Sequence, residues 1–283
     1  MEKNFLAVIS LFCLLHSAFA ATTINVTNKY AYAANLGWVD ARGDTNSGGV
    51  IGEYVCAGNI YAANVGWINL GSGSPANQIQ YQNNSATDYG VNNDGLGNLR
   101  GYAYAANIGW INFENTGAPK VDLFTGNLSG SVWSANCGWI ALSNATAFVQ
   151  TDSIQKGALA PDGLPIAWLL QNFLTTNVAP QLDPDGDGVS NADEYLAGTD
   201  PLNAASVLKI TSIFRNQSAN NTALNWNAVN TRYYAIQTNS SLSTGTFGDF
   251  AAPALLGFNN ASFFDNTTTN HFFRIRVYRP LIP

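Results

Sequence analysis

The chain has 283 residues, and its formal net charge of −6 is combined with a charged fraction of only 11%. Nucleic-acid binding requires clustered Lys and Arg that neutralise phosphates, so this composition excludes nucleic acid as an expected partner. The main basic group is Arg274, Arg276 and Arg279, whose alternation is expected for one exposed face of a strand.

Residues 1–20 have the pattern of a signal peptide. Lys3 precedes an apolar run over residues 5–15, and Ala18 and Ala20 form the small-x-small pattern of a signal peptidase site. No later stretch contains the run of about 18 apolar residues that a membrane span needs. The sequence therefore predicts an exported protein, secreted or extracellular at the cell surface, with no membrane span after removal of the signal.

Two cysteines follow the predicted signal peptide, Cys56 and Cys137. An exported protein can keep a disulfide, but the sequence does not show whether the two Cα atoms approach each other. A disulfide and two buried free thiols therefore both stay open.

Residues 24–148 carry four copies of one short motif. Each copy has an aromatic residue, two small residues, Asn, a variable residue, Gly, Trp and a β-branched residue. The Trp residues that follow the motif Gly in the four copies are Trp38, Trp67, Trp110 and Trp139. The first and third Trp are 72 positions apart, as are the second and fourth, which indicates a duplicated pair. Repeated units of this kind are expected to pack against one another.

Each copy is predicted to be a β-hairpin. Aromatic and small residues alternate over residues 101–105, which is the period of a strand, and Asn107 and Gly109 tolerate the positive φ of a turn. Residues 110–113 then lead the chain back. We therefore expect residues 21–150 to form an all-β domain of four repeated β-hairpins with further short strands.

The recurring aromatic residues of the motif allow two interpretations. Each ring buries about 150–250 Å², which a domain rich in Gly and Ala needs for its core. Alternatively, rings exposed on one face would form a platform on which sugar rings stack. The composition favours the core.

Residues 151–205 have helical patterns, in contrast to the strand patterns of residues 21–150. The strongest helical pattern after the signal peptide covers residues 164–174, with Pro165 in its first turn. A second, short helix is expected over Asn191–Ala197, ended by Gly198. The region is predicted to be a small helical unit.

An acidic loop leads into the second helix. Over residues 183–194, oxygen-bearing side chains occupy loop positions 1, 3, 5, 9 and 12, and Gly188 occupies position 6. Ca²⁺ takes about six to eight oxygen ligands, and this EF-hand-like spacing wraps one loop around one ion. The predicted ligands are Asp183, Asp185, Asp187, the carbonyl of Val189, Asn191 and Glu194.

A degenerate copy of the acidic loop lies upstream, at residues 162–165. If Asp162 is aligned with Asp187, three ligand positions fall on Ala158, Ala160 and Leu169, which offer no side-chain oxygen. We therefore expect one ion site in the unit.

Residues 206–283 return to strand patterns. Strand-like runs separated by Asn, Ser, Gly and Pro occur at 207–213, 222–226, 233–237 and 272–278. They predict a small β-sandwich with Trp226 in its core.

Two segments resemble known families. Residues 183–203 resemble the thrombospondin type 3-like and dockerin-like calcium repeats of secreted bacterial proteins, and residues 162–168 are similar to the half-repeat that often comes first. Residues 224–277 resemble the fibronectin type III-like module often found at the C-terminus of such proteins. The resemblance implies a secreted or surface protein with one intact loop, whereas a dockerin has two.

Residues suited to catalysis are few. After residue 20 the chain has a single His, His271, and it contains no G-x-S-x-G motif. We therefore expect a protein that is not an enzyme. The leading hypothesis is a secreted or surface-associated calcium-binding protein with a structural or adhesive role, in which one Ca²⁺ loop couples two β domains. Its expected partners are surface glycans or other cell-surface proteins.

Two alternatives stay open. One is a carbohydrate-binding protein that uses the aromatic residues of the β repeats. The other is a glycan-acting hydrolase, which needs two carboxyl groups on either side of a glycosidic bond. The acidic residues considered for that role are Asp40, Asp44, Glu53, Asp88, Asp94, Glu114 and Asp122.

Overall fold

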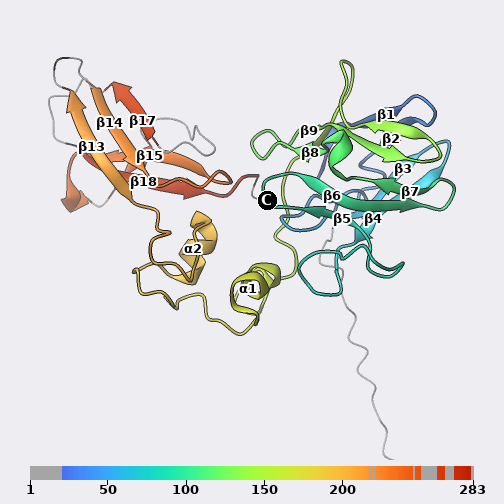
Figure 1. Cartoon of the computed structure of the whole chain (residues 1–283). Coiled ribbons are helices and arrows are strands. Elements are labelled where there is room, and N and C mark those ends of the chain that lie inside the picture. Colours follow the sequence, from blue (N-terminus) through green and yellow to red (C-terminus); the bar gives the residue numbers. More distant parts are fainter. Residues whose placement is uncertain are drawn as a thin grey trace, which may run out of the picture.

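The structure is a computed structural model that describes residues 21–216, 218, 221–244, 246–249, 260–264 and 271–281. A β-barrel, two short helices and two small C-terminal sheets follow one another along the chain (Figure 1). The prediction of a mainly β fold is confirmed. The predicted signal peptide, residues 1–20, lies outside the described residues.

The barrel region contains twelve short strands and a 3-10 helix, η1. They are β1 (Ile24–Ala33), β2 (Gly37–Asp40), β3 (Ala57–Ala62), β4 (Gly66–Ser72), β5 (Val91–Asn93), β6 (Leu99–Ala105), β7 (Gly109–Asn112), η1 (Asn115–Gly117), β8 (Lys120–Val121), β9 (Leu128–Ser129), β10 (Ser131–Ser134), β11 (Gly138–Ala141) and β12 (Val149–Thr151).

Eight of these strands form a closed sheet. Antiparallel pairing runs in the order β1, β2, β3, β4, β6, β7, β10 and β11, and β11 pairs back with β1 through Ala141 and Tyr32. Closure gives every one of the eight strands a neighbour on both sides, which removes the two open edges that an unclosed sheet would present. β12 and β5 extend the sheet by pairing with β1 and β6.

Small and β-branched residues fill the barrel, and the motif aromatics lie outside it. In β6 and β7, for example, Ala103, Ala105 and Ile111 are buried, whereas Tyr104 and Trp110 are exposed. The five Trp residues of the four motif copies keep between 42% and 49% of their surface exposed. The prediction that these aromatics form the core is therefore wrong. An eight-stranded barrel has an interior just wide enough for side chains, and mainly Ala, Val, Ile and Leu occupy it here, together with Phe113.

Each motif copy places its aromatic residues opposite each other on two paired strands. The cross-strand pairs are Tyr32–Trp38, Tyr61–Trp67, Tyr104–Trp110 and Trp133–Trp139. Their ring centroids are 4.9–5.0 Å apart and their planes are inclined by 62–63°. Edge-to-face pairs of this kind stabilise neighbouring strands.

The motif Asn residues join the four turns into a ring. Each side-chain amide donates to the backbone carbonyl of the variable residue in the preceding copy. The bonds run from Asn64 to Leu36 (3.0 Å), Asn107 to Val65 (3.0 Å), Asn136 to Ile108 (3.0 Å) and Asn35 to Cys137 (3.3 Å). The last bond connects the first copy to the fourth, so the ring closes as the barrel does. The motif Gly after each turn has a φ between 71° and 83°, which a side chain would strain.

The two cysteines after residue 20 are buried free thiols. Both belong to the barrel core, and Cys137 is the variable residue of the fourth motif copy. Burial raises the pKa of Cys56 to about 12. Of the two possibilities that the sequence left open, the structure has the unpaired thiols.

The two helices are α1 (Ile166–Phe173) and α2 (Asn191–Ala197). The predicted bounds of α2 and its end at Gly198 are confirmed, because Gly198 has a φ of 73° and donates to the carbonyl of Glu194 at 2.7 Å. The helices pack through Trp168 and Tyr195, whose ring centroids are 5.6 Å apart. No helix in the described ranges is long and apolar enough to cross a membrane.

Within its described residues, the C-terminal region contains two three-stranded sheets. Its elements are β13 (Ile210–Asn216), β14 (Asn221–Trp226), β15 (Tyr233–Asn239), η2 (Leu242–Thr244), β16 (Gly248–Asp249), β17 (Asn260–Phe264) and β18 (Phe272–Tyr278). One sheet has the order β13-β14-β17 and the other β16-β15-β18. Side chains of both sheets share one hydrophobic cluster, in which Leu224, Trp226 and Tyr234 are buried. The predicted place of Trp226 in a core is confirmed.

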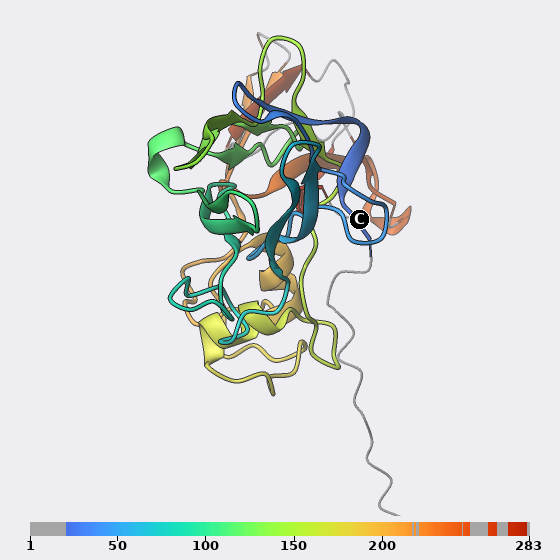
Figure 2. The ribbon, with the colours of Figure 1, turned by 90° about the vertical axis from the view of Figure 1, so that its right-hand side faces the viewer.

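The helices lie between the barrel and the C-terminal sheets in sequence and below both in space (Figure 1, Figure 2). After β18 the chain returns to the barrel, where Leu281 packs against the barrel core and accepts a hydrogen bond from the Ile154 amide at 2.9 Å. The two β regions are therefore connected both through the helical unit and through this C-terminal segment.

Candidate metal centre and the adjoining junction

The acidic loop brings three carboxylates together. Oxygen atoms of Asp183, Asp185 and Asp187 lie within 4.8 Å of one another, close enough to share one metal ion. Asp183 is exposed and the other two are half-buried. Gly186 and Gly188 have φ values of 77° and 91°, so the backbone turns sharply between the carboxylates.

Backbone amides of the loop donate to both oxygens of Asp183 and to one oxygen each of Asp185 and Asp187. Asp183 accepts from the amides of Gly186 and Gly188, both at 2.8 Å, and these bonds hold the pKa of Asp183 below its usual range. Asp187 accepts from the Val189 amide at 2.8 Å. Asp185 Oδ2 and Asp187 Oδ2 are buried and have no hydrogen-bond partner within the described residues.

Further oxygen atoms without a partner come from α2. Glu194 is completely buried, and neither of its carboxylate oxygens has a hydrogen-bond partner within the described part of the chain. Burial and the negative charges of Asp185 and Asp187 raise the pKa of Glu194 to about 7. Asn191 is also buried; its Nδ2 donates to the Ala179 carbonyl at 2.9 Å, while its Oδ1 is unpaired.

These oxygens fit a hard divalent cation. A buried carboxylate is costly without a compensating charge or hydrogen bond, and buried unpaired acceptors require a partner. Ca²⁺, when bound, supplies the positive charge that these oxygens lack. The residues that would hold it are the predicted set, Asp183, Asp185, Asp187, Val189, Asn191 and Glu194.

The structure brings the predicted ligands together to different degrees. The three Asp residues form the compact 4.8 Å group, which does not include Glu194. Glu194 is nevertheless close enough to Asp185 and Asp187 for their charges to raise its pKa. Val189 contributes its amide to the loop, and its predicted carbonyl ligand stays a prediction.

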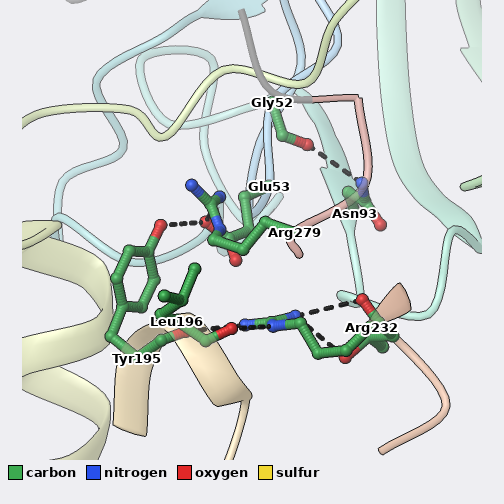
Figure 3. A network of polar contacts seen from close by, with 8 residues as sticks. Gly52, Glu53, Asn93, Tyr195, Leu196, Arg232 and Arg279 are labelled. Atoms are coloured by element: carbon green, nitrogen blue, oxygen red, sulfur yellow. Dashed lines mark hydrogen bonds and ion pairs between the residues drawn. The ribbon is translucent and has the colours of Figure 1, made fainter. Parts of the chain in front are cut away.

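The residue after Glu194 forms a junction between all three regions (Figure 3). The hydroxyl of Tyr195, in α2, donates to Glu53 Oε2 at 2.7 Å, and Glu53 lies in the barrel region. Arg279, after β18, donates to the same oxygen at 2.6 Å, and its guanidinium carbon lies 4.7 Å from the centre of the Tyr195 ring. Burial and the Glu53 charge raise the pKa of Tyr195 well above its ordinary value.

A second Arg of the C-terminal region holds the backbone of α2. Arg232 donates to the carbonyls of Tyr195 at 2.9 Å and Leu196 at 2.8 Å (Figure 3). On the barrel side, Asn93 Nδ2 donates to the Gly52 carbonyl at 2.9 Å and fixes the loop that carries Glu53. Helix α2 is therefore held by charged groups from both β regions.

Sequence reasoning did not find this junction. Arg274 and Arg276 lie on the exposed face of β18 as predicted, but Arg279 is buried and paired with Glu53, which corrects the prediction for the third Arg. The spacing carried a signal, because a step of three from Arg276 to Arg279 breaks the period of two that keeps side chains on one face of a strand.

Comparisons with known proteins bear on the acidic loop alone. The sequence model of the bacterial TSP3 repeat family matches residues 183–204. No curated protein matches the chain significantly. No solved structure matches it significantly. The match supports the thrombospondin type 3-like calcium repeat, in which the Asp183, Asp185 and Asp187 cluster could bind a metal ion.

Proposed function

We propose that this protein is a secreted or surface-associated calcium-binding protein with a structural or adhesive role. One Ca²⁺ in the acidic loop stiffens the connection between the barrel and the C-terminal sheets. The observation that carries this proposal is the position of α2. Its Glu194 belongs to the acidic loop, and the next residue, Tyr195, contacts Glu53 of the barrel region and Arg279 of the C-terminal region.

Calcium would act on this junction through the rigidity of α2. With the loop loaded, Glu194 would be held as a charged ligand, and the first turn of the helix would be anchored to the acidic loop. Tyr195 then keeps one orientation between Glu53 and Arg279. At the millimolar Ca²⁺ concentrations outside cells even a weak site is filled, so a permanent structural ion fits better than a signalling one.

Two observations support the proposed export of the chain and the proposed module type of residues 206–283. TSP3-type repeats and the signal-like residues 1–20 favour export of the chain. The two C-terminal sheets with a shared core support a fibronectin type III-like module as the family of residues 206–283. The proposed units are residues 21–150, 151–205 and 206–283.

A role without catalysis is proposed because the acidic side chains of the barrel region hold structural contacts. Asp40 pairs with Lys29 at 2.7 Å, and Glu53 with Arg279 at 2.6 Å. The others accept hydrogen bonds from nearby backbone amides; they are Asp44, Asp88, Asp94, Glu114 and Asp122. A glycosidase needs one carboxyl group that can donate a proton and another that is available to water or sugar.

Glycan binding by the barrel is a second candidate function. The specific observation in its favour is the exposure of the motif aromatics, since half-exposed Trp and Tyr rings offer apolar faces to a ligand. The rings within each pair are inclined by 62–63°, so each pair offers a corner, whereas a flat platform would need coplanar rings.

Calorimetric titration with Ca²⁺ tests the first proposal. We expect the full chain to bind one ion, and Asp187→Asn to abolish binding because it removes a ligand charge at constant size. Asp162→Asn, in the degenerate upstream copy, is the matched control and is expected to leave binding unchanged. Equal binding by wild type and Asp187→Asn would refute the assigned site.

A further inference from the structure

A pocket of about 270 Å³ opens on the outer side of the barrel at the fourth motif copy. Its walls come from the end of β7, from η1 and from the aromatic pair of β10 and β11. The lining residues are Asn112, Glu114, Thr116, Gly117, Trp133 and Trp139. The pocket therefore combines two indoles with an amide, a carboxylate and a hydroxyl group.

The two indoles form a corner that is held in place. The ring centroids of Trp133 and Trp139 are 5.0 Å apart, the planes are inclined by 63°, and both residues keep more than 40% of their surface exposed. The backbone of η1 lies directly against Trp139, because a Cβ on Gly117 would come within 2.9 Å of that indole. The glycine thus lets η1 pack closely against the ring.

The polar groups at the pocket are also fixed. Glu114 Oε1 accepts a hydrogen bond from the Gly101 amide at 3.0 Å, which ties the carboxylate to β6. The Glu114 amide donates to Asn112 Oδ1 at 2.5 Å. A carboxylate and an amide held beside exposed aromatic faces are the kind of few, well-placed polar groups that orient a small ligand.

The related position in the second motif copy is built differently. A shift of 72 positions relates Trp133 and Trp139 to Tyr61 and Trp67, but it relates Asn112 and Glu114 to Asp40 and Arg42. Asp40 is paired with Lys29 at 2.7 Å, and the Arg42 guanidinium donates to the Ile24 carbonyl. Both of these charged side chains are engaged within the barrel, so the second copy offers similar aromatics without the polar pair.

We propose that the Trp133–Trp139 pocket binds an uncharged pyranose of a glycan. The apolar C–H face of the sugar stacks on an indole, and its hydroxyl groups bond to Glu114 and Asn112. The Glu114 charge disfavours acidic sugars, because two carboxylates in close contact repel each other. This inference rests on glycan binding, the second candidate function, and is independent of the calcium site.

Calorimetry on the full chain, with chitohexaose and cellohexaose as uncharged probes and hexagalacturonate as an acidic probe, tests the site. We expect at least one uncharged probe to bind the wild type. Trp139→Ala is expected to raise the Kd of that probe about tenfold or more, a loss typical of one aromatic stacking contact. Trp67→Ala is the matched control, since Trp67 is similarly exposed and occupies the related position. It is expected to bind within a factor of about two of wild type.

Glu114→Gln keeps the shape of the pocket and separates recognition from folding. We expect it to reduce discrimination against hexagalacturonate relative to the uncharged probes. If Trp67→Ala weakens binding as much as Trp139→Ala, or if Glu114→Gln leaves discrimination unchanged, the assigned pocket is refuted while glycan binding by the barrel stands. If neither uncharged probe binds the wild type, the pocket and glycan binding of these probes are both refuted.

Discussion

The hydroxyl of Tyr195 donates a 2.7 Å hydrogen bond to Glu53, although the two residues are 142 positions apart in the chain. Arg279 donates to the same carboxylate oxygen and stacks on the Tyr195 ring. The preceding residue, Glu194, is a completely buried carboxylate of the acidic loop. A single turn of α2 thus joins the candidate metal centre to both β regions.

The effects of substituting Glu53 and Arg279, a buried ion pair, on the free energy of unfolding are expected to be strongly coupled. The side chains of Glu53 and Arg279 are 16% and 6% exposed, so removal of either charge leaves the other buried without its ion-pair partner. We expect Glu53→Gln and Arg279→Met each to lower the free energy of unfolding by about 3–5 kcal/mol, and the double variant to lose much less than the sum. Urea denaturation of the full chain measures all three.

The more exposed pair of Lys29 and Asp40 provides the control for this cycle. It has a similar length of 2.7 Å, but both side chains are 23% exposed. Lys29→Met is expected to cost about 1 kcal/mol or less, since water screens such pairs. Additive losses at Glu53 and Arg279, or losses no larger than that of the control, would contradict a coupled junction.

The positive φ of the motif Gly predicts a cost for any side chain there. Gly66 has a φ of 83°, and a Cβ at this position would meet no atom within 4 Å, so Gly66→Ala changes only the backbone preference. We expect it to lower the free energy of unfolding by about 1–2 kcal/mol, measured by denaturant titration. Gly248→Ala, also in open space but without a positive φ, is expected to be neutral or slightly stabilising. Equal changes in the free energy of unfolding for the two substitutions would contradict a left-handed backbone conformation at Gly66.

Alkaline pH is expected to destabilise the barrel. Burial raises the pKa of Cys56 from an ordinary value of 9.0 to about 12, and that of Tyr81 from 10.0 to about 12. Above pH 9 the unfolded chain therefore loses protons that the folded chain keeps. The free energy of unfolding should then fall as pH rises from about 9 to 12, by at most about 1.4 kcal/mol per pH unit for each group.

Denaturant titrations at a series of pH values from 8 to 11 check this expectation. Cys56→Ala removes one of the two groups and should flatten the profile between about pH 9 and 10, where the thiol of the unfolded chain titrates first. A wild-type profile that stays flat above pH 9, or a Cys56→Ala profile as steep as that of wild type, would contradict it.

Local features of the fold were predictable from sequence. The acidic loop and α2 depend on neighbouring residues, namely the alternating Asp side chains and the left-handed Gly198. Trp226 was predicted in a core because a strand pattern surrounds it, and it is buried. The residues that form each of these patterns lie within a few positions of one another, so a short segment of sequence is enough to predict the structure there.

Features that depend on closure or on distant pairing were not predictable. The alternation of Tyr and Ala in β6 fixes two faces, but it does not say which face is inside. Only the closed eight-stranded barrel, whose interior is just wide enough for side chains to fill, places Ala103 and Ala105 inside and Tyr104 outside. The pairing of Glu53 with Tyr195 and Arg279 likewise exists only once three regions are assembled.

Hydrogen exchange with and without Ca²⁺, followed by mass spectrometry on the full chain, tests calcium coupling at the level of individual segments. A hundredfold excess over Kd adds about 2.7 kcal/mol to the stability of the state that binds the ion, which is about a hundredfold slower exchange where opening releases it. We predict this slowing in α2 and in the loop of Glu53, and unchanged exchange in β6 and β7. Identical exchange of α2 with Ca²⁺ and with a chelator would contradict it.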